Sequence, residues 1–406
     1  MQCLQDCVVD SLCMSSVKSP MIGVVGGGQL AQMLAQAAKR RAVDVVVQSG
    51  SAIDPAAVEA TRLVLADPVD VEATSKLVQG CCGVTFENEW VDIEALIPLE
   101  QQGVCFSPSL TALAPLVDKI SQRQLLRELD LPSPDWTLLS SISFTQPELP
   151  REWNFPVMAK SSRWGYDGKG TKVLKSVEDL SQLLRSVDPT QWLLESWVPF
   201  EKELAIVVSR DAQGRVRSLP LAETHQFQQV CDWVIAPASV DHAVEMMAYN
   251  MAASLLTELN YVGVLAVEFF YGPDGLQVNE VAPRTHNSAH FSIEACSSSQ
   301  FDQQLCIAAG LPVPATDLHA PGALMVNLLG LQKGADSSLD ERLAKLRSCD
   351  RFHLHWYGKD CETPGRKLGH VTVLLNGVDA PSRQLEAETA LKHIRSIWPT
   401  QDTVCA

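Results

Sequence analysis

The chain has 406 residues, of which 46% are hydrophobic and 20% are charged, a balance that is typical of a folded globular enzyme and excludes a disordered or fibrous protein. We expect two or three domains, because a single hydrophobic core stops growing at about 250–300 residues. The formal net charge of -16 opposes general binding to nucleic acid or to an anionic membrane, so an anionic substrate must meet a local group of basic residues.

The first twenty residues lack a basic start and contain Asp6 and Asp10, so they resemble neither a signal peptide nor a membrane span. We expect residues 1–20 to be a disordered extension, with Met14 or Met21 as alternative start sites. The twelve cysteines of the chain are scattered and form no CxxC pair. This pattern favours reduced thiols and a cytoplasmic location.

A strand, a glycine turn, an amphipathic helix and a second strand follow one another from residue 21. The strands are MIGVV (21–25) and VDVVVQ (43–48), and the helix begins at Gln29. This βαβ unit predicts a parallel sheet with a ligand crevice beyond the carboxyl ends of its strands. The alternation continues to about Pro115, which predicts an N-terminal α/β domain over residues 21–115.

The glycine turn fits the G-x-G-x-x-A form of the dinucleotide fingerprint, starting at Gly26. A nicotinamide enzyme would also place an acid at the end of the second strand to hold the ribose hydroxyls, but this strand ends in Gln48 and Ser49. We therefore interpret the turn as a binding site for another small anion, with pure turn geometry as the alternative. A later apolar stretch, GVTFENEW, delivers Glu87 and Glu89 at a strand end.

A second glycine cluster, at residues 165–170, comes after a strand that ends in Lys160. Its backbone amides could surround phosphate oxygens while the lysine supplies a positive charge. Another lysine, Lys119, lies at the start of a helix that the two prolines of LPSP stop. The alternative for the cluster is a hairpin turn with exposed lysines.

Two acids follow on strand-like runs of this middle region. Glu195 ends the apolar run WLL, and the residues after it are placed to run along a nucleotide base. Glu203 could accept hydrogen bonds from ribose hydroxyls. Both residues could equally be surface acids.

Two glutamates flank the turn PDG in the stretch VEFFYGPDGLQVNE. If residues 273–275 form a three-residue loop with Gly275 in the left-handed region, Glu268 lies opposite Glu280 on one face of a hairpin. Facing carboxylates between apolar strands shift their pKa values or need a cation, and oxygen ligands suit magnesium that carries nucleotide phosphates. The alternative is one surface glutamate and one that pairs with Arg284.

Basic residues gather after the hairpin, in the run RTHNS from Arg284 and in Lys359, Arg366 and Lys367. In so acidic a chain they offer a grip for the phosphate or carboxylate of a second substrate. Composition shifts after a Pro-rich stretch, so we place domain edges near residues 116 and 318. These edges predict a middle domain over 116–318 and a C-terminal domain over 319–406.

Six stretches in order carry a specific resemblance: VVGGGQLAQML, DKISQRQLLRELDLPSP, AKSSRWGYDGKG, GVLAVEFF, NEVAPRTHNSAH and HLHWYGKDCETPGRKLGH. Over roughly residues 21 to 380 the chain resembles 5-(carboxyamino)imidazole ribonucleotide synthase, an ATP-grasp enzyme of de novo purine synthesis. The resemblance implies a Rossmann-like N-terminal domain, a two-lobed ATP-grasp domain that clamps nucleotide between antiparallel sheets, and a small β-rich C-terminal domain. It also implies a homodimer.

The resemblance implies a role for each matching residue. ATP is expected to contact Lys119, Lys160, Gly165, Tyr166, Asp167, Gly168, Lys169, Gly170, Thr171, Glu195, Ser196, Trp197, Val198, Glu203, Asn279 and Glu280. Magnesium is expected on Glu268 and Glu280. The second substrate is expected to contact Gln29, Tyr166, Arg284, Asn287, Ser288, Lys359, Arg366 and Lys367. The expected catalytic residues are Arg284, Lys359 and Asp167.

The implied reaction activates bicarbonate with ATP to give carboxyphosphate, whose carboxyl group passes to the exocyclic amine of aminoimidazole ribonucleotide. One departure lies in the stretch ETHQF, where the usual histidine register falls on Gln226, beside His225, and leaves an ATP role there open. Three other functions are considered. They are a formate-dependent glycinamide ribonucleotide transformylase, a nicotinamide oxidoreductase and a catalytically silent nucleotide-binding protein.

Overall fold

The computed structural model describes residues 19–163, 165, 170–331, 338–359 and 361–400. The expectations for most of the N-terminal extension and for Tyr166, Asp167, Gly168 and Lys169 therefore lie outside the described residues.

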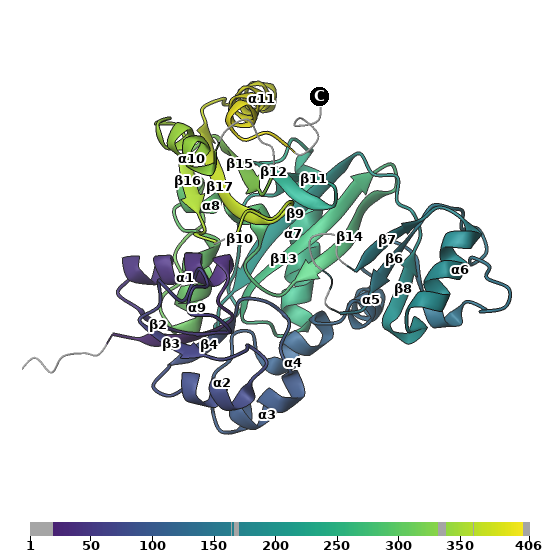
Figure 1. Cartoon of the computed structure of the whole chain (residues 1–406), viewed down its shortest axis with the longest axis horizontal. Coiled ribbons are helices and arrows are strands. Elements are labelled where there is room, and N and C mark those ends of the chain that lie inside the picture. The colour runs from purple at the N-terminus through teal and green to yellow at the C-terminus, as the bar shows by residue number, and fades with distance from the viewer. Residues whose placement is uncertain (1–18, 164, 166–169, 332–337, 360, 401–406) are drawn as a thin grey trace, which may run out of the picture.

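The N-terminal part is a four-stranded parallel sheet between helices, as the βαβ pattern predicts (Figure 1). Its elements are β1 (Met21–Val25), α1 (Gln29–Arg40), β2 (Asp44–Ser49), β3 (Arg62–Leu65), α2 (Val71–Leu77), β4 (Gly83–Phe86), α3 (Ile93–Gln101) and α4 (Leu110–Leu113). The strand order is β3-β2-β1-β4. Its strands are largely apolar because helices cover both faces of a parallel sheet. The glycine turn after β1 and the acids after β4 meet at the carboxyl edge.

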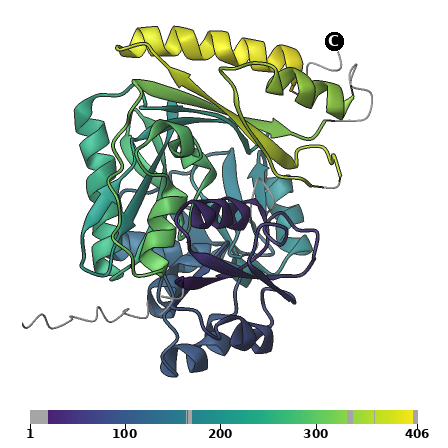
Figure 2. The same ribbon diagram turned by 90° about the vertical axis from the view of Figure 1, so that its left-hand side faces the viewer.

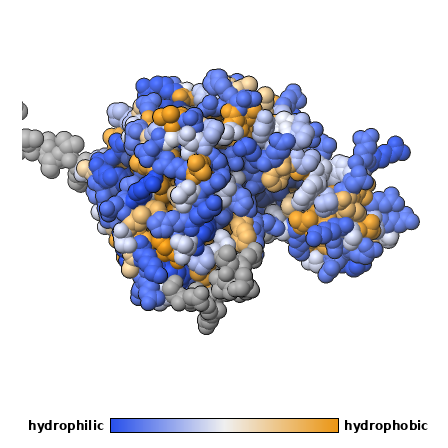
Figure 3. Space-filling view, turned by 90° about the horizontal axis from the view of Figure 1, so that it is seen from above, coloured by the Kyte–Doolittle hydropathy of each residue, from blue (hydrophilic) through white to orange (hydrophobic). Residues whose placement is uncertain are grey.

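The middle of the chain begins with a small lobe around an antiparallel sheet. Its elements are α5 (Lys119–Glu128), β5 (Trp136–Leu138), β6 (Val157–Ser161), β7 (Thr171–Leu174), α6 (Val177–Ser186) and β8 (Trp192–Glu195). The strand order is β5-β8-β6-β7, and α6 closes the core with Leu180, Leu183 and Leu184. Figure 3 shows this lobe at the right, projecting from the main body with a notch between the two.

A nine-stranded sheet forms the main body. Its elements and covering helices are β9 (Lys202–Arg210), β10 (Val216–Ser218), β11 (Ala222–Phe227), β12 (Val230–Ala236), α7 (His242–Glu258), β13 (Gly263–Gly272), β14 (Gly275–Ala282), α8 (Ser292–Ala295), α9 (Gln300–Ala308), β15 (Gly322–Leu329), α10 (Leu339–Arg347), β16 (His353–Trp356), β17 (Lys367–Leu375) and α11 (Ala380–Ile397). The order is β14-β13-β9-β11-β12-β15-β17-β16, with β10 on β9. The C-terminal strands thus continue the same sheet.

Helices join the parts of the molecule. α7 packs its apolar face on β9 and β13. α9 packs against α1 with Phe301 and Leu305, and its Gln304 binds both the Val264 N–H of β13 and the Thr85 hydroxyl of β4. Figure 2 shows α11, in yellow, lying along the outer side of the sheet, where it buries Ile394. The N-terminal sheet is therefore held at a fixed place beside the central hairpin.

Most predicted elements are present with shifted ends. The helix α7 begins at His242, with Asp241 in extended conformation at the N-cap position. The strand expected to end at Lys160 continues to Ser161. The domain edges near 116 and 318 remain predictions.

Two findings concern the environment of the chain. No helix in the described part is long and apolar enough to cross a membrane. The eight cysteines within the described ranges form no disulfide.

Candidate active site

The β13–β14 hairpin sets Glu268 directly opposite Glu280, as predicted, and Gly275 has a φ of +83°. The prediction of a three-residue loop is wrong, because the turn contains only residues 273–274. A regular ladder from this turn would pair Glu268 with Asn279 and point Glu280 to the other face. A β-bulge next to Glu268 restores the facing pair, and Asn279 is its extra residue.

The facing glutamates differ in charge state. Burial, the Glu280 charge and the Glu203 charge together raise the pKa of Glu268 to about 7. Burial also acts to raise the pKa of Glu280, but the ammonium of Lys119, 2.5 Å away, outweighs it and lowers that pKa. The side chains of Glu268 and Glu280 remain 25% and 35% exposed. Three carboxylates on one face of a sheet form a region that a cation would stabilise.

Magnesium fits this donor set. No cluster of three or more His, Cys, Asp or Glu ligands within the described ranges could hold a metal ion by itself. Magnesium is commonly bound by one or two carboxylates together with water and substrate phosphates, so Glu268 and Glu280 suffice for that mode of binding.

The raised pKa of Glu268 predicts that the stability of the fold depends on pH. Its pKa rises from 4.5 to about 7 on folding, so the folded state binds the proton more tightly, and the free energy of unfolding should fall as the pH rises through this window. Glu268→Gln should flatten this dependence, whereas Asp274→Asn at the tip of the same hairpin should not. Chemical denaturation at several pH values, without metal or nucleotide, measures the slopes. Equal slopes for Glu268→Gln and the wild type would contradict the raised pKa.

Two lysines reach the hairpin from different elements. Lys119, the first residue of α5, pairs with Glu280. Lys160 of β6 is buried, donates to the Asn279 side-chain oxygen at 3.0 Å and lies 2.7 Å from the Glu195 carboxylate. The two ammonium groups therefore face the acidic pair. This arrangement suits the phosphates of a nucleotide.

Glu195 is not a surface acid. Its side chain is buried between Arg123 and Lys160. Burial acts to raise its pKa, but these two cations outweigh burial and lower the pKa to about 2. Glu195 therefore carries a full negative charge inside the protein, where it fixes the lysine.

The other residues expected around the nucleotide lie on β7, on β9 and in the loops next to β6 and β8. Glu203 lies on the same face of the sheet as Glu268, and burial raises its pKa to about 7. Trp197 is half-exposed, and Ser196 donates its N–H to the Asp135 carbonyl. Thr171 pairs with Lys160 across the β6–β7 ladder. Val198, Gly165 and Gly170 lie in the adjoining loops.

The first glycine turn already binds an anion, and that anion is a side chain of the protein. The Glu87 carboxylate accepts the N–H of Gly28 at 2.6 Å and of Leu30 at 3.2 Å. A Cβ at Gly28 would lie 2.3 Å from a Glu87 oxygen, so the glycine allows this approach. The prediction of an external small anion is therefore wrong for these two amides. Gln29 lies between them at the first position of α1.

Gln48 completes the argument against a nicotinamide site. It is fully buried, donates its amide to the carbonyls of Asp67 and Asp70, and accepts the Thr74 hydroxyl. The side chain holds the loop before α2 and offers no acid to a ribose.

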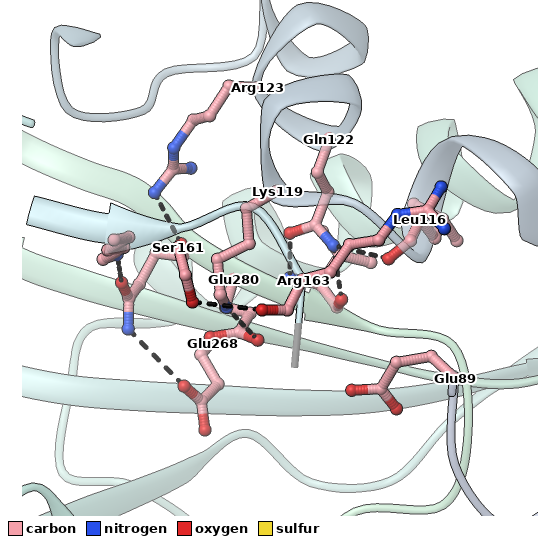
Figure 4. A network of polar contacts seen from close by, with 12 residues as sticks. Glu89, Leu116, Lys119, Gln122, Arg123, Ser161, Arg163, Glu268 and Glu280 are labelled. Atoms are coloured by element: carbon pink, nitrogen blue, oxygen red, sulfur yellow. Dashed lines mark hydrogen bonds and ion pairs between the residues drawn. The ribbon is translucent and has the colours of Figure 1, made fainter. Parts of the chain in front are cut away.

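Arg284 pairs with an acid of the N-terminal sheet instead of a hairpin glutamate, so the alternative interpretation of the hairpin is wrong. Its Nε donates to the Glu89 carboxylate at 2.7 Å. Glu89 follows β4, whereas Arg284 follows β14, so this pair connects the N-terminal sheet with the end of the β13–β14 hairpin. In Figure 4, Glu89 lies to the right of the hairpin glutamates.

The run after Arg284 turns back toward the hairpin. The His286 Nε2 lies 3.5 Å from a Glu268 oxygen, and its Nδ1 lies 2.9 Å from the Ser288 hydroxyl. Asn287 is buried in a reciprocal amide pair with Asn327 of β15. Asn287 and Ser288 therefore hold the backbone of residues 284–288 through side-chain hydrogen bonds.

The basic C-terminal loop approaches from the β16–β17 side. Lys359 donates its ammonium to the Lys367 carbonyl at 2.8 Å, and Arg366 donates to the Cys361 carbonyl at 3.4 Å. The Lys367 charge acts to lower the pKa of Glu268, against the larger effect of burial.

Sequence reasoning missed two contributors: Arg123, and the Glu89 carboxylate as the partner of Arg284. A signal for Arg123 existed, because it lies four residues after Lys119 on α5 and therefore on the same helix face. The long-range partner of Arg284 left no such signal.

Three family models match successive parts of the chain. Residues 20–115 match the ribonucleotide synthetase preATP-grasp domain, residues 124–301 the ATP-grasp domain, and residues 323–384 the phosphoribosylaminoimidazole carboxylase C-terminal domain. The chain is 47% identical over 384 residues to the N5-carboxyaminoimidazole ribonucleotide synthase of Synechococcus elongatus, covering 94% of this chain and 96% of that one.

Solved structures of carboxyaminoimidazole ribonucleotide synthases also match the fold of this chain. A carboxyaminoimidazole ribonucleotide synthase of Aspergillus clavatus complexed with ATP superposes with a TM-score of 0.84 at 31% identity, over 94% of this chain and 98% of that one. The Aspergillus clavatus synthase in complex with ADP and 5-aminoimidazole ribonucleotide gives a TM-score of 0.82 at 30% identity, with the same coverage.

Proposed function

This chain belongs to the N5-carboxyaminoimidazole ribonucleotide synthase family of ATP-grasp ligases, and on that premise we propose how its residues carry out the ATP-dependent carboxylation of 5-aminoimidazole ribonucleotide. The observation that carries the proposal is the hairpin on which Glu268 faces Glu280, with Lys119 and Lys160 directed at it. An acidic pair beside two lysines can bind the phosphates of ATP together with their metal ion.

Bicarbonate is the first nucleophile in the proposed reaction. One of its oxygens attacks the γ-phosphorus of ATP, the bond from that phosphorus to the bridging oxygen breaks, and ADP leaves with the electron pair. The exocyclic amine of the ribonucleotide then attacks the carbonyl carbon of carboxyphosphate. The carbon–oxygen bond to phosphate breaks, and the departing phosphate takes the proton that the amine loses.

The protein contributes position and charge to the phosphoryl step. Lys119 and Lys160 offset negative charge on the transferring group, and the buried carboxylate of Glu195 keeps Lys160 in place. Magnesium, held by Glu268 and Glu280, would supply further charge neutralisation at the phosphates when bound. The family resemblance also implies that residues 165–171 act as a lid, which would exclude water from the labile carboxyphosphate.

The second substrate is proposed to bind near Arg284 and the basic C-terminal loop. Arg284, which is held by Glu89, is proposed to bind an anionic group of bicarbonate or carboxyphosphate. Lys359, Arg366 and Lys367 form the basic group for the ribonucleotide phosphate in a chain whose net charge is -16.

We also propose that the protein is a cytoplasmic homodimer. The free cysteines in the described ranges support a reducing compartment, and the family resemblance supports the dimer. Light scattering should give a mass about twice 44.3 kDa. A mass of 44.3 kDa over the whole working concentration range would refute the dimer.

Phosphate release tests the substrate assignment. Purified protein with MgATP should release phosphate only when both bicarbonate and 5-aminoimidazole ribonucleotide are present. A parallel reaction with formate and glycinamide ribonucleotide should release none. Release with the formate pair alone would move the chain to the transformylase reaction, and no release with ATP still bound would favour a silent protein.

A further inference from the structure

Side chains of α5 bind the outer edge of β14, the strand that carries Glu280. β14 ends the nine-stranded sheet, so one row of its main-chain groups has no strand beside it. Gln122 donates its amide to the Val281 carbonyl and accepts the Val281 N–H, each at 2.8 Å. Arg123 donates to the carbonyls of Val278 at 3.0 Å and Asn279 at 2.7 Å. Gln122 and Arg123, which are adjacent on the helix, therefore hydrogen-bond the main chain of β14 on both sides of Glu280.

The same guanidinium reaches the sheet of the small lobe. Arg123 donates its Nε to one Glu195 oxygen at 2.7 Å, and Lys160 lies 2.7 Å from the other oxygen. Only 3% of the Arg123 and Glu195 side chains is exposed. Lys160 in turn donates to the side-chain oxygen of Asn279. The four residues thus form a closed ring that joins β8 and β6 of one sheet to β14 of the other.

We propose that Arg123 is a positioning residue for phosphoryl transfer, which fixes the bulge at Asn279 and, through Glu195, the ammonium of Lys160. Figure 4 shows Arg123, Gln122 and Lys119 extending from one helix, with Lys119 reaching Glu280. Lys119 from this helix holds Glu280 directly, while Arg123 holds the strand that carries it. The inference rests on the proposed function, because the groups it positions are those assigned to ATP and its metal.

An arginine suits this place better than a lysine. Its planar fork sends three nitrogens in fixed directions, one to a carboxylate and two to adjacent carbonyls. A lysine would replace these with one ammonium that cannot span all three acceptors. Loss of the fork would let the bulge and Lys160 shift independently.

The test compares Arg123→Gln and Arg123→Lys with Arg127→Gln. Arg127 is a matched control, since it lies one turn further on the same helix and stacks on Trp136, 4.6 Å away. Loss of a supporting partner lowers activity by ~10–100-fold, and we expect Arg123→Gln to lose this much in kcat/KM for MgATP, with KM for the ribonucleotide within about twofold. Arg123→Lys should recover part of the loss, because it restores a charge to Glu195.

Calorimetry with ADP, with and without magnesium, separates this inference from the proposed function. In the wild type and Arg127→Gln, magnesium should strengthen ADP binding, and in Arg123→Gln or Arg123→Lys this gain should shrink by ~10-fold or more. That result supports the inference even if the wild type shows no ribonucleotide-dependent phosphate release. A folded Arg123 variant with the kcat/KM for MgATP and the metal-linked ADP affinity of Arg127→Gln would overturn it. If Arg123→Gln does not fold, Arg123→Lys decides.

Discussion

Glu280→Gln is expected to lower kcat by more than ~100-fold while the protein stays folded, since even an outer-shell partner of a metal site costs ~10–100-fold. The amide keeps the shape of the side chain but removes the negative charge that faces Glu268 and pairs with Lys119. Repulsion with Glu268 disappears at the same time, so the fold loses little. Steady-state kinetics over a magnesium titration, together with circular dichroism, measures both effects.

Asp274→Asn is the matched control for that experiment, because it removes a carboxylate from the exposed tip of the same hairpin. It should leave kcat unchanged. Near-normal activity of Glu280→Gln at saturating magnesium would contradict the assignment of this carboxylate to the metal.

Lys160→Met is expected to reduce kcat/KM for ATP by ~10–100-fold, because a hydrogen bond to a charged group contributes about 1.5–3 kcal/mol. Methionine preserves the apolar stem and removes the ammonium that lies between Glu195 and Asn279. The buried Glu195 keeps Arg123 as its partner, so the charge stays paired and the protein should fold. Initial rates across ATP concentrations measure the change.

Lys172→Met provides the comparison on the neighbouring strand, where the exposed ammonium lies over the Trp192 ring, 5.6 Å from its centre. This variant should behave as the wild type. If Lys160→Met kept a normal KM and kcat for ATP, Lys160 would have no role at the phosphates.

The hairpin shows how far sequence reasoning reached. The strand alternation and Gly275 predict that Glu268 and Glu280 share a face, and the structure confirms it. The predicted three-residue loop is replaced by a two-residue turn and a bulge. Because the bulge adds Asn279 to one strand, Glu268 still pairs with Glu280. A bulge has no strong sequence signal of its own, because it depends on what packs along the strand edge. Here that edge is held by Arg123 and Gln122.

Local patterns could not reveal partners that are distant in the chain. The glycine turn predicts backbone N–H groups that are free to bind an anion. Two of these groups instead donate to Glu87, which lies 59 residues after Gly28. Arg284 finds Glu89 across 195 positions. Such pairs arise from the packing of whole domains, which periodicity and turn signals do not encode. The expected roles of the residues, in contrast, came from the family resemblance and stay predictions until they are measured.

The most direct test of the account follows one oxygen atom. With bicarbonate labelled with oxygen-18 and reaction times shorter than its exchange with water, mass spectrometry of the released phosphate reports which nucleophile attacked ATP. If bicarbonate attacks the γ-phosphorus on the Glu268–Glu280 hairpin, each phosphate carries one labelled oxygen. Unlabelled phosphate, formed while the ribonucleotide is still carboxylated, would contradict a carboxyphosphate intermediate and with it the proposed chemistry of this site.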